Sequence, residues 1–238
     1  MKNTKSFLLI LALSFALMAC GKDKDIIVPP LTKDFADLES DHTGALTYIN
    51  LDNGKRYPIR ENKSNYRTSP DTIIRAVCNY QLEWDENRKR YVKLPYAKPI
   101  LVVEPKSESS PVFQNGMKED PVYILSVWQG KKYLNMQIGI KTTPGSKHKF
   151  QFKEEKITVK DGTKYVDMAL YHDANGAEEK YQREVYLSIR TAKYFEEGIE
   201  SVVLRFGYHT KNRKGEVIQQ NKYKEAGYSF PKEKKKYM

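Results

Sequence analysis

Two of the four histidines in this chain, His148 and His172, stand among side chains that could support metal binding or acid–base chemistry. Asp120, Asp173 and Asn135 carry the oxygen atoms that could complete such a pocket. Each histidine, however, lies at the end of a predicted strand and shares its strand face with apolar residues. This placement favours a hydrogen-bonded histidine that closes the edge of a core.

The rest of the sequence lacks the spacings that other site chemistries require. It contains no H-E-x-x-H or C-x-x-C metal motif and no G-x-S-x-G nucleophile turn. The segment 173–176 lacks the later ligands of a calcium loop, and the adjacent Glu119 and Asp120 would point to opposite faces of a strand. We therefore predict that the protein is not an enzyme and has no catalytic residue, metal or cofactor. A metal-dependent hydrolase that uses His148 and His172 is kept as the second alternative.

Cys20 ends a leader whose composition is typical of a secretory signal peptide. Lys2 and Lys5 precede the apolar run 7–19, which is too short to span a membrane as a stable helix. Residues 17–20, Leu-Met-Ala-Cys, resemble the bacterial lipoprotein signal box. This resemblance implies cleavage before Cys20, thioether lipidation of its sulfur and acylation, for example by palmitate, of its new amino group. Multiple acyl chains would anchor the protein almost permanently, because each buried methylene contributes about 0.8 kcal/mol.

Residues 1–19 are therefore predicted to be a lipoprotein signal peptide, and residues 20–34 to be the lipidated cysteine and its tether. The Lys-Asp cluster at 22–25 partly matches the surface-export signal of lipoproteins in some Gram-negative anaerobes. We expect a lipoprotein of the cell envelope that is anchored in the outer membrane and faces either the periplasm or the cell surface.

The chain carries a formal net charge of +11, and loss of a leader with two lysines and no acid lowers it to +9. A basic excess is compatible with nucleic acid, an anionic membrane or an acidic polymer. Here the bases alternate with acids and apolar residues, as in residues 88–93, which is typical of the solvated outer faces of sheets. An envelope protein meets little nucleic acid, so we expect an envelope protein or an anionic glycan as partner and no nucleic acid. The oligomeric state stays open.

The first predicted domain spans residues 35–106 and consists of short strands at 46–51, 56–60, 72–84, 89–94 and 100–104. Asn53-Gly54 predicts a hairpin turn, since both residues tolerate the positive φ angles of a type I′ turn. Cys78 shares a strand face with apolar residues and is interpreted as a buried small side chain. A set of four short strands and one long strand, 72–84, favours an OB-like barrel.

The second predicted domain spans residues 107–238. Seven or eight strands at regular spacing predict a β-sandwich, so the fold class is all-β. In the strand 133–140, Leu134, Met136, Ile138 and Ile140 share one face, which is the alternation of a half-buried strand.

Trp128 and Tyr133 flank the turn of the central hairpin of this second domain. Both faces of the outgoing strand 122–128 are largely apolar, which is expected of a strand covered on both sides. The first domain is the expected cover, so the hairpin is predicted to form the interdomain contact. If these side chains are exposed instead, Trp128 and Tyr133 are candidate binding residues, as are His148 and His172.

Several short motifs together resemble those of the NigD-like lipoproteins. They are, in order, Leu-Asp-Asn-Gly at 51–54, Asp-Pro-Val-Tyr at 120–123, Val-Trp at 127–128, Tyr-Leu-Asn at 133–135, Lys-His-Lys at 147–149 and His-Asp-x-Asn-Gly at 172–176. The resemblance implies a lipidated cysteine, an OB-type domain and a C-terminal β-sandwich, and it implies no catalytic residue. We predict a non-catalytic binding lipoprotein, with a bacteriocin-immunity-like protein as the first alternative.

Overall fold

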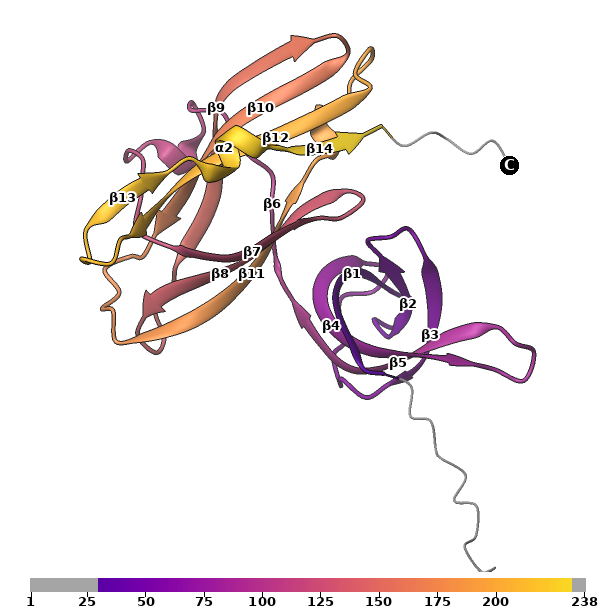
Figure 1. Ribbon diagram of the computed structural model, residues 1–238. Helices are drawn as coiled ribbons and strands as arrows, with labels where there is room; N and C mark the ends of the chain where they lie inside the picture. Colours follow the sequence, from indigo (N-terminus) through magenta and orange to yellow (C-terminus); the bar gives the residue numbers. More distant parts are fainter. Residues whose placement is uncertain (1–29, 233–238) are drawn as a thin grey trace, which may run out of the picture. The chain divides into compact units, whose positions relative to one another are not determined.

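The computed structural model describes residues 30–232, and nearly all of their regular structure is β-strand (Figure 1). The short helix α2 (Lys222–Ala226) and two 3-10 turns, η1 (Pro111–Phe113) and η2 (Ala192–Tyr194), are the other elements of this region. None of its helices is long and apolar enough to cross a membrane. The predicted signal peptide, Cys20 and most of the predicted tether lie outside the described residues.

The first five strands close into a barrel (Figure 1). They are β1 (Thr32–Ser40), β2 (Leu46–Leu51), β3 (Arg56–Asn62), β4 (Ile73–Trp84) and β5 (Arg90–Pro99). Their order around the barrel is β1-β2-β3-β5-β4, and β3 and β5 run parallel while the other pairs are antiparallel. This is the strand order of an OB-type barrel, so the predicted five-stranded barrel is confirmed.

Alternate residues of the barrel strands point inward and form its core. Ala36 and Leu38 of β1 are fully buried there together with Ala76 and Cys78 of β4. Burial raises the pKa of the Cys78 thiol to about 12. Cys78 therefore packs as a small apolar side chain, as its position in the strand pattern predicted.

Two strands differ from the sequence prediction. Residues 32–34, which we expected in the tether, belong to β1 and pair with β4. The strand expected at 100–104 as the fifth barrel strand forms β6 (Leu101–Val103), which pairs with a sandwich strand instead. In β1 only Ala36 and Leu38 alternate with the acids Asp37 and Glu39, which is too short a run to identify the strand, and the pattern of a short strand carries no information about its partner.

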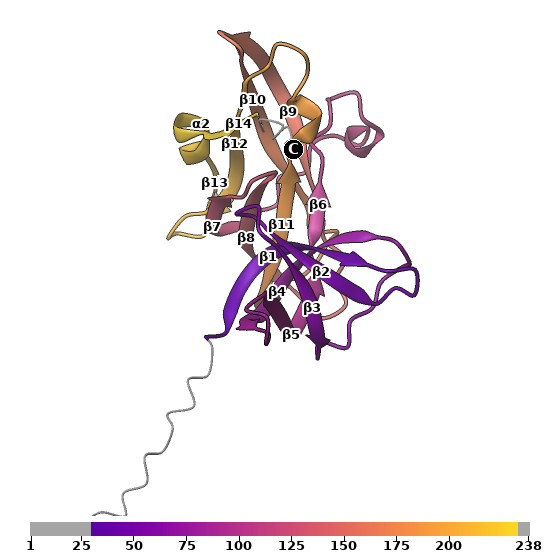
Figure 2. The same ribbon diagram turned by 90° about the vertical axis from the view of Figure 1, so that its right-hand side faces the viewer.

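The remaining strands form the two sheets of the predicted β-sandwich (Figure 1 and Figure 2). One sheet has the order β6-β11-β8-β7, with β11 (Tyr181–Arg190), β8 (Tyr133–Thr142) and β7 (Tyr123–Gln129). The other sheet has the order β13-β12-β10-β9, with β13 (Val217–Gln220), β12 (Ser201–Lys211), β10 (Thr163–Asp173) and β9 (Lys149–Lys160). In this sheet β14 (Tyr228–Pro231) also pairs with β12. The prediction of a sandwich is confirmed.

The sandwich core lies between these sheets. The alternating side chains of β8 that were predicted to face inward are all fully buried: Leu134, Met136, Ile138 and Ile140. Phe152, Met168 and Phe206 meet them from the opposite sheet. Because strand side chains alternate, Tyr133 and Asn135 must leave β8 on the face away from this core.

Barrel side chains cover that outer face of the β6-β11-β8-β7 sheet. The ring of Phe35, in β1, lies edge-on against Trp128 of β7 and Tyr186 of β11, with centroid separations of 4.7 Å and 5.6 Å. The Lys33 ammonium donates a hydrogen bond to the Tyr186 hydroxyl at 3.0 Å. The predicted contact between the central hairpin and the first domain is therefore confirmed.

Candidate functional site: the cleft beside the domain contact

Two hairpin turns, one from each domain, meet at the domain contact. The backbone N–H of Lys131 in the β7–β8 turn donates to the backbone oxygen of Asp52 in the β2–β3 turn at 3.1 Å. The neighbouring Gly130 has no room for a side chain, because a Cβ atom there would lie 2.2 Å from Oδ2 of Asp52. The hairpin turn predicted at Asn53-Gly54 is present, but only Gly54 has a positive φ, 82°, so it is not the type I′ turn that the sequence suggested.

Arg75 of β4 is the centre of a buried hydrogen-bond network at this contact. Its side chain is only 1% exposed. The guanidinium group donates to four side chains: Asp52 (2.6 Å), Asn135 (3.0 Å), Asp37 (3.3 Å) and Ser188 (3.4 Å). These acceptors offset the cost of removing the cation from water, which is several kcal/mol for an unpaired ion.

The sandwich side of this network is hydrogen-bonded within itself. The Asn135 amide nitrogen donates to Oδ2 of Asp52 at 2.7 Å, and the Ser188 hydroxyl donates to the Asn135 amide oxygen at 2.7 Å. Asn135 therefore accepts from Arg75 and donates to the carboxylate that pairs with Arg75. This geometry specifies one arrangement of the two turns.

Tyr133 covers the network at its outer edge. The Cζ atom of Arg75 lies 4.1 Å from the centroid of the Tyr133 ring, and the Tyr133 hydroxyl donates to Oδ2 of Asp37 at 3.4 Å. Burial raises the pKa of Tyr133. Burial also raises the pKa of Asp37, and the nearby positive charge of Arg75 opposes that effect.

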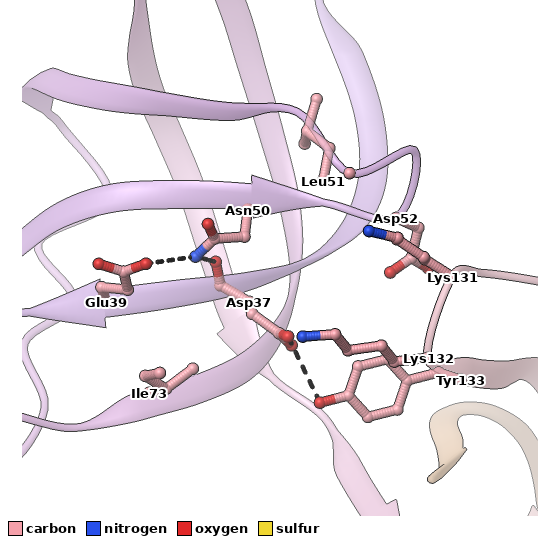
Figure 3. Close-up of a pocket in the computed structure, with 10 residues that line it drawn as sticks. Asp37, Glu39, Asn50, Leu51, Asp52, Ile73, Lys131, Lys132 and Tyr133 are labelled. Carbon is pink, nitrogen blue, oxygen red and sulfur yellow. Dashed lines mark hydrogen bonds between the residues drawn. The ribbon is translucent and has the colours of Figure 1, made fainter. Parts of the chain in front are cut away.

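A cleft opens beside Tyr133, between the barrel and the β7–β8 turn (Figure 3). Its volume is about 240 Å³, and its lining side chains include Asp37, Glu39, Asn50 and Asp52 from the barrel and Lys131, Lys132 and Tyr133 from the sandwich. Adjoining hollows of about 420 Å³ and 230 Å³ share Lys132 and extend toward Arg190 and Lys232. We refer to these three neighbouring hollows together as the domain cleft.

The two walls of the domain cleft differ in charge. Its acids come from the barrel, whereas the sandwich contributes lysines and Arg190. Within residues 30–232 the Lys132 ammonium has no ion pair or hydrogen bond, and Arg190 has a long contact of 3.8 Å to Glu104. The sandwich wall therefore presents positive charge that an anionic group could neutralise.

The structure separates the predicted site residues Trp128 and Tyr133. Tyr133 lines the domain cleft, although only 6% of its surface is exposed. Trp128 is half-buried against Phe35 and belongs to the packed part of the domain contact. Of the two, Tyr133 is therefore the one placed to touch a ligand in the cleft.

His148 and His172 contact each other but do not line the domain cleft. Nδ1 of His148 lies 2.9 Å from Nε2 of His172, and Nδ1 of His172 lies 2.9 Å from the Asp120 carbonyl oxygen. A carbonyl oxygen only accepts, so Nδ1 of His172 carries the proton and its Nε2 accepts from His148. Nε2 of His148 lies 2.8 Å from the Thr142 hydroxyl oxygen. Burial lowers the pKa of both imidazoles.

This geometry agrees with the hydrogen-bonded interpretation of the histidines. All four ring nitrogens have partners, and Phe150 stacks on His172 with a centroid separation of 4.6 Å. The Asp120 carboxylate accepts from the backbone N–H of Ala174 at 2.7 Å. In the described part of the chain, no group of three or more histidine, cysteine and acidic side chains could hold a metal ion.

Arg75 and Asp52 are the residues beside the cleft that sequence reasoning missed. Asp52 lies in a motif that indicated only a turn, and Arg75 is one base in a long strand whose other face is apolar. A single charged residue on a strand normally indicates a solvent-facing position. No local pattern distinguishes a base that pairs with residues from another domain.

Comparison with known proteins finds a matching family model and solved structures of similar fold. The family model described as the NigD-like C-terminal beta sandwich domain matches residues 103–221. The chain is similar to the crystal structure of a NigD-like immunity protein from Bacteroides caccae, with 28% identity and a TM-score of 0.76, over 87% of this chain and 99% of that one. No curated protein matches the sequence.

Two other solved structures share the fold at lower identity. One is a protein of unknown function from Bacteroides vulgatus, with 19% identity and a TM-score of 0.61, over 85% of this chain and 92% of that one. The other is a protein from Bacteroides fragilis described as a lipoprotein, with 10% identity and a TM-score of 0.55, over 87% of this chain and 100% of that one.

Proposed function

Because this chain belongs to the NigD-like family, we propose that it is a non-catalytic, lipid-anchored envelope protein that binds an anionic partner in the domain cleft. The observation that carries this proposal is the cleft itself. Side chains of both domains line it, and the buried Arg75 network beside it sets their relative positions. A cleft of preset shape loses little conformational freedom when a ligand binds.

The charge of the sandwich wall supports an anionic partner. Lys132 is exposed and unpaired within residues 30–232, and the hollow lined by Lys131, Lys132 and Lys232 has no acidic lining residue. An envelope protein with surface carboxylates, or a glycan that carries uronate or phosphate groups, has the complementary charge.

The state of the polar side chains supports a non-catalytic role. In the part of the chain that the structure describes, the two histidines that sequence reasoning singled out bond to each other, to Thr142 and to Asp120. Asp52 is likewise held by Arg75 and Asn135. No specific observation favours the metal-dependent hydrolase, because metal binding would require these histidines to give up their present partners.

The partner is tested by retention from envelope extract on the immobilised chain from Gly21 to Met238. Lys132→Glu reverses one charge in the cleft, and Lys214→Glu makes the same change in the exposed β12–β13 turn. We expect retention by the wild type and by Lys214→Glu, its loss at high salt, and its loss with Lys132→Glu. Protease or periodate treatment of the extract distinguishes a protein from a glycan. Equal retention by both variants would show that the cleft is not the contact.

The lipid anchor is supported by residues 17–20, and it is tested by metabolic labelling with radioactive palmitate. We expect label and membrane association in the wild type and in Cys78→Ala, whose substitution lies in the barrel core. Cys20→Ala should remove both. Label on Cys20→Ala would refute this anchor.

An immunity role is a second candidate, favoured by the similarity to the B. caccae immunity protein over 87% of this chain. Cells that lack the gene should then lose viability in toxin-containing culture supernatant of a competing strain. Complementation by wild type and by Lys214→Glu, but not by Lys132→Glu, would connect protection with the cleft. Unchanged survival of the deletion strain would dismiss this candidate.

A further inference from the structure

A separate hollow lies on the barrel, at the tip of the β4–β5 hairpin. Its volume is about 470 Å³, and it is lined by Arg60 of β3, Trp84, Asp85, Glu86 and Asn87 of the hairpin, and Tyr91 of β5. We refer to it as the hairpin-tip site. It shares no lining residue with the domain cleft.

Trp84 is the most unusual residue of this site because 60% of its surface is exposed. Its indole ring is positioned by Arg90, whose Cζ lies 4.6 Å from the ring centroid. A guanidinium stacked on one face of an indole leaves the opposite face available to a ligand. Trp84 is thus an exposed aromatic side chain with a guanidinium over one face of its ring.

The polar groups around Trp84 are partly fixed and partly unused. Arg60 pairs with Asp85 at 2.6 Å and lies over the Tyr91 ring at 4.9 Å, so these side chains are held in place. The side chains of Glu86 and Asn87 have no hydrogen-bond or ion-pair partner within residues 30–232. They supply acceptors and donors to a ligand in the hollow.

The charges in the hollow argue against a polyanion. Its titratable lining groups are one base, Arg60, two acids, Asp85 and Glu86, and the Tyr91 phenol, and the base is already paired with Asp85. The bases 88–90 lie beside the turn but do not line the hollow. A nucleic acid or an anionic glycan would bring its charges toward Glu86, whereas strong nucleic-acid binding depends on neutralising phosphates with bases.

A neutral sugar matches this combination of groups. One face of a pyranose ring consists of C–H groups, which pack on the electron-rich face of an indole, while its hydroxyl groups both donate and accept hydrogen bonds. OB barrels also bind oligosaccharides on the face of their second and third strands and at the loop between strands 4 and 5, and the hairpin-tip site combines that loop with Arg60 of β3. We propose that the hairpin-tip site binds a neutral oligosaccharide, with one sugar ring stacked on Trp84 and hydroxyl groups bonded to Glu86, Asn87 and Arg60.

The test is a fluorescence titration of the full chain in detergent, which is informative because the sequence has only two tryptophans, Trp84 and Trp128. The probes are neutral oligosaccharides of glucose, mannose, galactose and xylose, with alginate and oligo-dT as anionic comparisons. We expect a neutral sugar to change the emission of the wild type and of Trp128→Phe, but not of Trp84→Phe. The change should persist at high salt, because no ion pair is formed with the ligand.

Calorimetry with the sugar that responds gives the second readout. Trp84→Ala should weaken binding at least tenfold, the change that corresponds to about 1.4 kcal/mol, and Asn87→Ala should weaken it less. Both positions are exposed, so circular dichroism should show an unchanged fold.

Several outcomes would overturn the proposal: no response to any neutral sugar, equal affinity of Trp84→Ala and the wild type, or binding of alginate or oligo-dT alone. The result is independent of the proposed cleft function. Lys132→Glu should keep sugar binding, and Trp84→Ala should keep the envelope partner.

Discussion

A buried guanidinium stabilises a domain contact only while its donors are matched by acceptors. Arg75 satisfies this condition through acceptors on both sides of the contact, with Asp52 and Asp37 on the barrel side and Asn135 and Ser188 on the sandwich side. Removing the base leaves two largely buried carboxylates without their cation, which is the costly way to break a buried pair.

Arg75→Met should therefore lower the free energy of unfolding by about 3–5 kcal/mol. Arg56→Met is the matched control, since Arg56 pairs with Glu39 while its side chain is 49% exposed, and exposed pairs contribute about 0–1 kcal/mol. Urea denaturation monitored by circular dichroism measures both. Equal losses in the two variants would contradict a stabilising role for the buried network.

The histidine pair predicts a pH dependence of stability. Burial lowers the folded-state pKa of His148 and His172 below the ordinary value of 6.5. The unfolded chain then binds more protons just below pH 6.5, so stability falls as the pH drops from 6.5 toward the folded-state pKa values and is fully present above that window.

Urea titrations between pH 8 and pH 5 should show this loss in the wild type and in His42→Gln, whose substitution lies in the barrel. The double variant His148→Gln, His172→Gln should show a smaller loss across the same window. An unchanged pH profile in the double variant would assign the dependence to other groups.

At the scale of elements, the β7–β8 turn is shaped by what it packs against. Gly130 is needed because Asp52 occupies the space of its missing side chain. Asp52 cannot easily move aside, since Arg75 and Asn135 hold the same oxygen atom at 2.6 Å and 2.7 Å.

Gly130→Ala should thus destabilise the protein more than Gly139→Ala, where the added Cβ would meet the flexible end of Gln182 at 3.0 Å. In an Asp52→Ala background the cost of Gly130→Ala should largely disappear, because contacting residues are not additive. The denaturant midpoints of the wild type, of Gly130→Ala, of Asp52→Ala and of the double variant measure this double-mutant cycle. Additive effects would refute the proposed clash.

The outgoing strand of the same hairpin shows a limit of simple alternation. The sequence places Ile124 with Trp128 on one face and Val127 on the other. A β-bulge between Ile124 and Ser126 shifts the register, so Ile124 and Val127 both pack on the sandwich core while Trp128 faces Phe35. An extra residue in a bulge reverses the side-chain faces beyond it.

At the scale of the whole described chain, barrel and sandwich are predicted to unfold together. The Arg75 network and the aromatic group of Phe35, Trp128 and Tyr186 both join them. Trp128→Ala should cost about 2 kcal/mol, less than the 3–5 kcal/mol of a fully buried aromatic, because Trp128 is half-buried.

Calorimetry checks this coupling. The wild type should show one unfolding transition, and the double variant Arg75→Met, Trp128→Ala should show two as the domains separate. Trp84→Ala is the control, since its side chain is on the β4–β5 tip, and it should keep a single transition. Two transitions already present in the wild type would contradict cooperative unfolding.

The sequence by itself determined those features that arise from neighbouring residues. The alternation in β8 identified the strand and its buried face, and the apolar neighbours of Cys78 indicated its burial. Asn53-Gly54 identified the β2–β3 hairpin turn but not its type, since only Gly54 has a positive φ. Such features follow from the two-residue period of a strand and from the φ angles that a turn requires.

The tertiary structure alone decided which elements and side chains meet. It assigned β6 to the sandwich, added β1 to the barrel, and brought Arg75 and Asp52 to Asn135 across 60 and 83 positions of sequence. It also left the Trp84 side chain exposed to solvent and placed Trp128 at the domain contact. The physical reason is that a pairing between distant residues leaves no local period, and its energy exists only once the surrounding chain has folded around it.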